Sequence, residues 1–354
     1  MFPSKMGNIW TTRKNCNREK TASMTKLHKN LLTAFKVAFA AGLIVYLISS
    51  GGLNLHSMGK VMAHPGWFSL VTLLWGLLTV ITSIRWYLLL LAQGVMITFW
   101  KTLSLNFIGM FFNLCLPGAT GGDLVKCYYL ASIYPGKKME TITTVLIDRV
   151  LGVAGLVLVG GISVLAHPAI SLGGNRMVRT FSCSILAVCI TTLLGLILLL
   201  NLPVSFLDAH LERHSHGLLG NMLMRGYRAM RVYRDKQFTI YFSLFLSSLV
   251  HTTIIITSLI IGRVIGSPMS WRFYGVITPL GLIASALPIA PAGLGVGEAA
   301  FEYLYKLVGS SLGGEIIAVI HLIAIFWGLV GLPFYLLVRK SPQPASAEGT
   351  FVAE

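Results

Sequence analysis

The sequence predicts an all-α polytopic membrane protein, and its composition, its apolar segments and the placing of its charges all indicate this. Of the 354 residues, 55% are hydrophobic and only 11% are charged, and the mean hydropathy is +0.76. A soluble domain carries about 25% charged residues. A cytosolic globular enzyme, a coiled coil and a disordered chain are therefore excluded, whereas a membrane helix bundle fits the length as one unit.

Basic residues outnumber acidic ones, since 28 Lys and Arg against 12 Asp and Glu give a formal net charge of +16. They flank apolar stretches and form no aromatic-basic module, which argues against a nucleic-acid partner. This pattern is typical of loops held at an anionic cytoplasmic leaflet. The five cysteines include no CxxC pair, so we expect no disulfide framework and no metal site, and we expect no cofactor.

The N-terminal segment 1–30 is a basic extension that we expect in the cytoplasm, with Met24 as an alternative start. The apolar run from Val37 to Leu55 is longer than the core of a signal peptide, so it is expected to be a retained first helix. A second helix, about Trp67 to Leu91, then returns to the inside, because about 20 apolar residues span the hydrocarbon core.

Segment 102–122 is uncharged and long enough to cross, but it contains two asparagines, Pro117 and the glycines Gly118, Gly121 and Gly122. Its flanks are basic, with Lys101 before it and Lys126 after it. If both flanks are cytoplasmic, the segment is a re-entrant hairpin, and a full span stays open as the alternative. Broken backbone is tolerated at membrane depth only where protein or a wet cavity surrounds it.

Helix 141–166 is then expected to run outward, and helix 180–202 to return. Linker 203–237 is basic and is placed inside, with Leu218 to Lys236 as an amphipathic helix on the inner leaflet.

Helix 238–262 is expected to run outward again. Segment 273–308 is broken by prolines and glycines, so it is a second re-entrant hairpin or a span. The last helix, 315–338, precedes a short cytoplasmic tail, 341–354.

This order amounts to a repeat. The pattern helix, helix, re-entrant hairpin, helix occurs first in residues 31–166. It occurs again in the second half of the chain, where residues 167–202 hold an outer loop and the first helix, and residues 238–340 hold the rest. Each half has three crossings, so the halves are inverted relative to each other. We therefore expect six full spans plus two re-entrant hairpins in the cell inner (plasma) membrane, with both termini cytoplasmic because most basic residues then lie inside.

The two broken segments read LPGATGGD (116–123) and APAGLGVGE (290–298), and each runs from a proline through glycines to one carboxylate. Glycines permit tight turns and expose N–H groups that can hold a phosphate. Alternatively, the acids only cap the next half-helix. Matching broken segments in inverted halves point to a transporter's substrate site. The candidates are Asn113, Pro117, Gly118, Gly121, Gly122, Asp123 and Lys126 in the first hairpin, and Pro291, Gly293, Gly295, Gly297 and Glu298 in the second.

Together, LCLPGATGGDLVKCYYL, VLIDRVLG and LPIAPAGLGVGEAAFEYL resemble the flippase-like membrane region of lysylphosphatidylglycerol synthases, over about residues 30–340. The resemblance implies movement of lipid between leaflets. Two-part family members add a soluble aminoacyl-transfer domain. The sequence ends soon after the last helix, so that synthase activity is not expected.

Charge inside the bilayer costs about 2.5–3.5 kcal/mol per residue and is a functional candidate by default. Arg85 either snorkels outward or acts in function. Asp148 and Arg149 are neighbours on one helix, so each needs a partner on a different side. Arg149 could bind a lipid phosphate by its bidentate fork, or pair with Asp123 or Glu298.

Glu298 is the candidate for a cationic headgroup or a coupling proton. Glu302 and Lys306 are expected to form a surface pair, and His251 and His321 to be core histidines.

The leading function is a flippase that carries a phospholipid or a polyisoprenoid-phosphate lipid. An intramembrane lipid-modifying enzyme, such as a lipid-linked transferase or phosphatase, and a small-solute secondary transporter stay open. Membrane lipids with anionic headgroups are the expected partners, and a homo-oligomer and a separate lipid-synthesising enzyme are left open.

The topology predicts a labelling pattern. In a cysteine-free background, single cysteines placed near Lys60 and Arg176 should react with an impermeant maleimide in intact cells, whereas cysteines in linker 203–237 should react only after permeabilisation. Labelling of the linker in intact cells would contradict the orientation.

Overall fold

The computed structural model describes residues 59, 63–115, 121–171, 173, 175–201, 231–267, 269–285 and 296–338. Within these ranges the fold is entirely helical, as predicted. The expected first helix at 37–55, the basic extension 1–30, most of linker 203–237 and the tail 341–354 lie outside the described residues.

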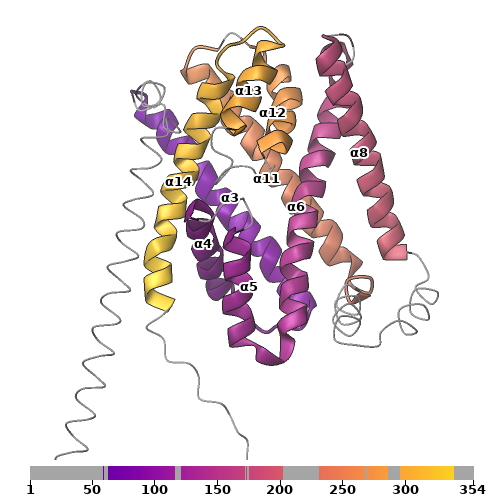
Figure 1. Cartoon of the computed structure of the whole chain (residues 1–354), viewed down its shortest axis with the longest axis vertical. Coiled ribbons are helices and arrows are strands. Elements are labelled where there is room, and N and C mark those ends of the chain that lie inside the picture. The colour runs from indigo at the N-terminus through magenta and orange to yellow at the C-terminus, as the bar shows by residue number, and fades with distance from the viewer. Residues whose placement is uncertain are drawn as a thin grey trace, which may run out of the picture. The chain divides into compact units, whose positions relative to one another are not determined.

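Five helices are long and apolar enough to cross a membrane, and they confirm the five predicted spans that fall within the described ranges. They are α3 (Pro65–Ala92), α6 (Lys138–Ala166, preceded by the 3₁₀ turn η1, Pro135–Lys137), α8 (Arg176–Asn201), α11 (Gln237–Val264) and α14 (Gly313–Val338). A four-residue helix, α7 (Pro168–Ser171), joins α6 to α8. Helix α8 packs mainly on α6 and is largely exposed, as Figure 1 shows at its right edge.

Each predicted hairpin segment contains two helices, and the residues that connect them lie outside the described ranges. The first consists of α4 (Phe99–Cys115) and α5 (Gly121–Ile133), and the second of α12 (Trp271–Ser285) and α13 (Val296–Lys306). The two helices of each pair pack against each other. In Figure 1 the α4–α5 pair lies in the lower part of the bundle and the α12–α13 pair at its top.

Two sequence-based boundaries are wrong. Lys126, assigned to a basic flank of segment 102–122, lies inside α5 and is only 8% exposed. Its charge is held by neighbours within the fold, so an uncharged run does not delimit this hairpin. The amphipathic helix predicted over Leu218 to Lys236 does not include residues 232–236, which form turns, and Tyr233 is buried against α3.

These turns complete the C-terminal end of α3. The last carbonyl groups of a helix have no partner within it. Tyr233 Oη donates to the carbonyl of Leu89 (3.1 Å), and Lys236 Nζ donates to that of Ala92 (2.8 Å). Lys137 Nζ donates to the carbonyl of Gly94 just beyond the helix. Cations at this end also complement the helix dipole.

Helix α14 packs closely on α4, although the two belong to different halves of the chain. A Cβ on Gly331 would overlap the carbonyl of Phe107. The rings of Phe107 and Phe334 stack with centroids 4.9 Å apart. Small residues at such crossings let membrane helices approach until their backbones touch.

This close approach predicts that Gly331→Leu lowers stability by about 1–3 kcal/mol, because the added side chain pushes α14 away from α4. The thermal unfolding temperature of the purified protein in detergent should fall accordingly. Gly195→Leu is the matched control, since nothing lies within 4 Å of a Cβ at this position on α8. Equal unfolding temperatures for the two variants would contradict the packing argument.

Candidate functional site

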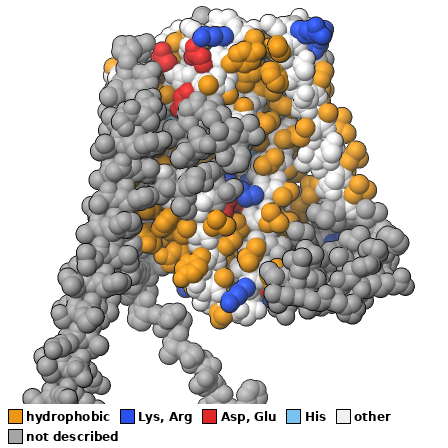
Figure 2. All heavy atoms as spheres, viewed as in Figure 1, with side chains coloured by type: hydrophobic (Ala, Val, Ile, Leu, Met, Phe, Trp, Pro, Cys, Tyr) orange, Lys and Arg blue, Asp and Glu red, His pale blue; other side chains and the backbone are white. Residues whose placement is uncertain are grey.

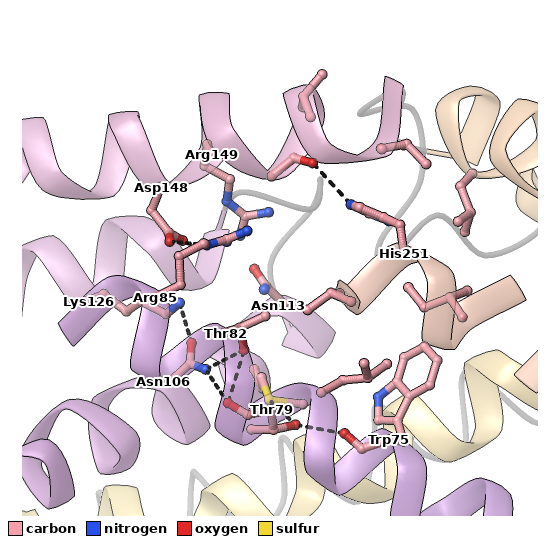
Figure 3. Close-up of a pocket in the computed structure, with 18 residues that line it drawn as sticks. Trp75, Thr79, Thr82, Arg85, Asn106, Asn113, Lys126, Asp148, Arg149 and His251 are labelled. Carbon is pink, nitrogen blue, oxygen red and sulfur yellow. Dashed lines mark hydrogen bonds and ion pairs between the residues drawn. The ribbon is translucent and has the colours of Figure 1, made fainter. Parts of the chain in front are cut away.

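A cavity of about 390 Å³ lies between α3, α4, α5, α6, α11 and α12 (Figure 3). Its lining combines apolar side chains with polar and charged ones. The apolar residues are Trp75, Leu78, Met110, Val153, Leu156, Val250, Ile254 and Leu282, the polar and charged residues are Thr79, Thr82, Arg85, Asn106, Asn113, Lys126, Asp148, Arg149 and His251, and Gly152 also borders the cavity.

Arg85 and Asp148 form the first buried ion pair of the cavity. Arg85 Nε lies 2.7 Å from Asp148 Oδ1, and Arg85 Nη1 donates to Ser247 Oγ at 2.6 Å. The two charged side chains are 8% and 14% exposed, so Arg85 does not snorkel outward and that interpretation is wrong. A buried charge must be paired to be tolerated. The pair and its serine therefore tie together α3, α6 and α11.

Arg149 pairs with Asp123 through its Nε, so of the two predicted partners Asp123 is the one that the structure selects. The Arg149 side chain is nevertheless 43% exposed. Among the described residues, Asp123 is its only hydrogen-bond partner. The two terminal amino groups of the guanidinium are therefore available at the cavity.

Lys126 is the third cation of the cavity. Its Nζ donates to Asn106 Oδ1 at 2.6 Å, lies 3.6 Å from Asp123 Oδ1, and stands 5.2 Å from the centre of the Trp86 ring. Asn106 Nδ2 in turn donates to Ser83 Oγ at 2.9 Å. This chain of contacts fastens the first hairpin to α3. Figure 3 shows both arginines, Asp148 and Lys126 on one side of the cavity, and His251 across from them.

The hydroxyl groups that bind Arg85 and Asn106 were not predicted from the sequence, because single Ser and Thr residues in apolar helices carry little signal. A clue was present in their spacing. Thr79, Thr82 and Ser83 recur at three- and four-residue intervals ahead of Arg85, which places a polar stripe on one face of α3.

Gly122, in the first turn of α5, has a packing role in this structure. Its N–H donates to Asn113 Oδ1 at 2.7 Å, and a Cβ there would overlap the carbonyl of Gly109. Because α4 already uses this donor, a headgroup would have to displace Asn113 to bind it, and the role of Gly122 in headgroup binding stays a prediction. Gly121 is buried beside it. The candidates Pro117, Gly118, Pro291, Gly293 and Gly295 lie outside the described residues.

The second hairpin holds a carboxylate–imidazole pair. Glu298 Oε1 lies 2.7 Å from His321 Nδ1, and these side chains are 21% and 12% exposed. His321 was predicted as a core histidine, and hydropathy gives no sign that α14 turns it toward Glu298 on α13. His251 is satisfied at one nitrogen only: Nε2 lies 3.0 Å from the carbonyl of Gly152, whereas Nδ1 is buried without a hydrogen-bond partner among the described residues. Glu302 and Lys306 form the expected surface pair at 2.7 Å.

The cavity has an excess of positive charge. Three cations (Arg85, Lys126, Arg149) face two carboxylates (Asp123, Asp148), and both carboxylates are held by arginines. Within the described ranges no cluster of His, Cys, Asp and Glu could hold a metal ion. The arrangement therefore suits an anion that can share the guanidinium of Arg149.

The comparisons with known proteins point to one family. The profile described as the lysylphosphatidylglycerol synthase TM region matches residues 33–339. No curated protein and no solved structure matches the chain.

The Arg85–Asp148 pair predicts strong coupling between two substitutions. Arg85→Met or Asp148→Leu alone leaves a buried charge without its partner and should cost about 3–5 kcal/mol, whereas the double variant should regain most of that loss. Unfolding in mixed detergents measures the cycle. The exposed pair Glu302–Lys306 is the control, and its coupling should stay below about 1 kcal/mol. Additive losses at Arg85 and Asp148 would contradict the pairing.

Proposed function

This chain belongs to the family of the lysylphosphatidylglycerol synthase transmembrane region, and we propose that it moves a lipid with a phosphate-bearing headgroup between leaflets. Family membership and the five apolar helices make it a multi-pass membrane protein of a lipid-related family. We propose that, within this family, the chain translocates a phospholipid or a polyisoprenoid-phosphate lipid.

The exposed guanidinium of Arg149 carries this proposal. Its Nε is fixed by Asp123, so the remaining amino groups are oriented and can receive two oxygens of one phosphate. A net positive cavity compensates the phosphate charge, and the apolar lining residues suit the glycerol and the first methylenes of a lipid. Figure 2 shows a small group of blue and red side chains midway along a face whose other visible side chains are mostly hydrophobic.

The packing of the hairpins supports an inverted repeat. The first helix of each hairpin packs against the last helix of the other half: α4 contacts α14, and α12 contacts α6. Both hairpins consist of two separate helices that pack against each other, and the two pairs lie at opposite ends of the bundle in Figure 1. Inverted broken helices surround the substrate site of many transporters, where alternating access arises as one part moves against the other.

An intramembrane enzyme fits this cavity less well. Acid–base chemistry needs a carboxylate or imidazole within reach of the bound lipid and able to exchange a proton. Asp123 and Asp148 are both held in ion pairs with arginines, and His251 Nε2 contacts a backbone carbonyl. The charges are therefore arranged for binding.

Arg149 gives the direct test of this function. In proteoliposomes with a leaflet-resolved assay, Arg149→Ala should lower lipid movement by at least about tenfold, and Arg149→Lys should restore it only partly because an ammonium lacks the fork geometry. Arg179→Ala removes an exposed arginine near the start of α8 and should leave the rate unchanged. Full movement by Arg149→Ala, or none by wild type with any phospholipid or prenyl phosphate, would refute the proposal.

A further inference from the structure

We propose that Glu298 and His321 form a second headgroup site, the repeat-related counterpart of Asp123 and Arg149, which binds a phosphate headgroup when His321 is protonated. This inference rests on the proposed function, because it takes the same lipid through a second contact. It gives a role to the Glu298–His321 pair, which does not line the cavity described above.

A constant sequence offset relates the two sites. Gly109 on α4 and Gly281 on α12 are 172 positions apart, and each lies where a Cβ would overlap a side chain of the second helix of its own hairpin, Lys126 and Phe301 respectively. Asn113 and Ser285 are also 172 positions apart. The first helices of the two hairpins are therefore in the same register.

The same register holds in the long helices that follow. Arg149 on α6 and His321 on α14 are again 172 positions apart. Asp123 and Glu298 are 175 positions apart, and so are the glycines before them, Gly122 and Gly297. The offset of the second hairpin helices is thus three residues larger than that of the helices before and after them. This difference falls in the segments that connect the helices, so each carboxylate can still face the base on the following long helix.

The local contacts match as well. Gly122 donates to Asn113, and a Cβ on Gly297 would lie 3.0 Å from Ser285 Oγ, the residue at the position equivalent to Asn113. In each hairpin a glycine thus brings the second helix against a polar residue of the first. The next residue is a carboxylate in the first turn of that helix, and it binds the base on the following long helix.

The two bases differ in one chemical property. A guanidinium is charged at all physiological pH values, whereas an imidazole changes its charge between about pH 5 and 8. With Glu298 ionised, neutral His321 donates from Nδ1 to the carboxylate and presents the lone pair of Nε2, which repels an oxyanion. Protonation adds an N–H at Nε2, which can donate to a phosphate while the bond to Glu298 is kept.

Of the described charged groups on the helices packed around α14, Glu298 is the one that contacts His321. On α13, Glu302 pairs with Lys306, and on α3, Arg85 pairs with Asp148. Glu315 lies in the first turn of α14, and Lys101 and Arg263 lie near the ends of α4 and α11. On α11, His251 contacts the carbonyl of Gly152. Among the described residues, Glu298 is the hydrogen-bond partner of His321.

The test compares lipid movement at about pH 5.5 and about pH 8. Wild type should move lipid about tenfold faster at the acidic pH, the gain expected of one charge-assisted hydrogen bond. His321→Arg places a guanidinium opposite Glu298, as Arg149 lies opposite Asp123, so lipid movement should be fast at both pH values. His321→Gln removes the imidazole charge, so lipid movement should be slow at both pH values. His64→Gln removes an exposed histidine and should keep the wild-type profile.

A second measurement separates this inference from the proposed function. Native mass spectrometry counts dioctanoyl phosphatidylglycerol bound to the full chain in detergent, with glycerol 3-phosphate as the chain-free probe. Wild type should bind two lipids at about pH 5.5 and one at about pH 8, and His321→Arg should bind two at both.

Two lipids at acidic pH without any lipid movement would refute translocation and support the second site. A pH-independent count in wild type, or a pH-dependent count in His321→Arg, would overturn the inference. Glycerol 3-phosphate bound as tightly as the lipid would overturn the assignment to a lipid headgroup.

Discussion

Two adjacent residues of α6, Asp148 and Arg149, pair with two of the three charged residues that are buried in the described part of the chain, Arg85 and Asp123. Neighbouring residues of a helix point about 100° apart, because a turn takes 3.6 residues. Asp148 and Arg149 must therefore find partners on different helices, and they reach Arg85 on α3 and Asp123 on α5. Since an unpaired charge in this setting is costly, the pairs fix how α3 and the first hairpin are rotated about α6. The cavity is the space that this arrangement leaves open.

Much of the fold follows from hydropathy. Uncharged runs of about 20 residues predict the five long helices within the described ranges. Prolines are a weaker guide, because Pro279, which was expected to break segment 273–308, lies inside α12. The need of Asp148 and Arg149 for separate partners also follows from the helical period alone. Helix ends that depend on specific contacts do not follow, as the turns at 232–236 show, where Tyr233 and Lys236 bind α3.

For Arg149 the sequence narrowed the partner to Asp123 or Glu298, but the other pairs of the site could not be predicted. Arg85 meets Asp148 across 63 positions of sequence, and His321 meets Glu298 across 23. Such pairs depend on how each helix is rotated and how deeply it sits, which composition does not encode. Lys126 was misplaced for the opposite reason: a lysine usually marks a loop, but here Asp123, Asn106 and the Trp86 ring stabilise it inside the hairpin.

The contact of α14 with α4 has a mechanical consequence. Gly331 brings α14 against the backbone of Phe107, and the rings of Phe107 and Phe334 stack, so a shift of α4 relative to α14 would break this packing. Under the proposed function, the parts that move would therefore not be the two sequence halves, because the first helix of each hairpin packs on the last helix of the other half. The ion pair of Arg149 with Asp123 joins α6 to α5. A phosphate that competes for Arg149 would weaken this link, so lipid binding and the release of α5 from α6 would be the same event.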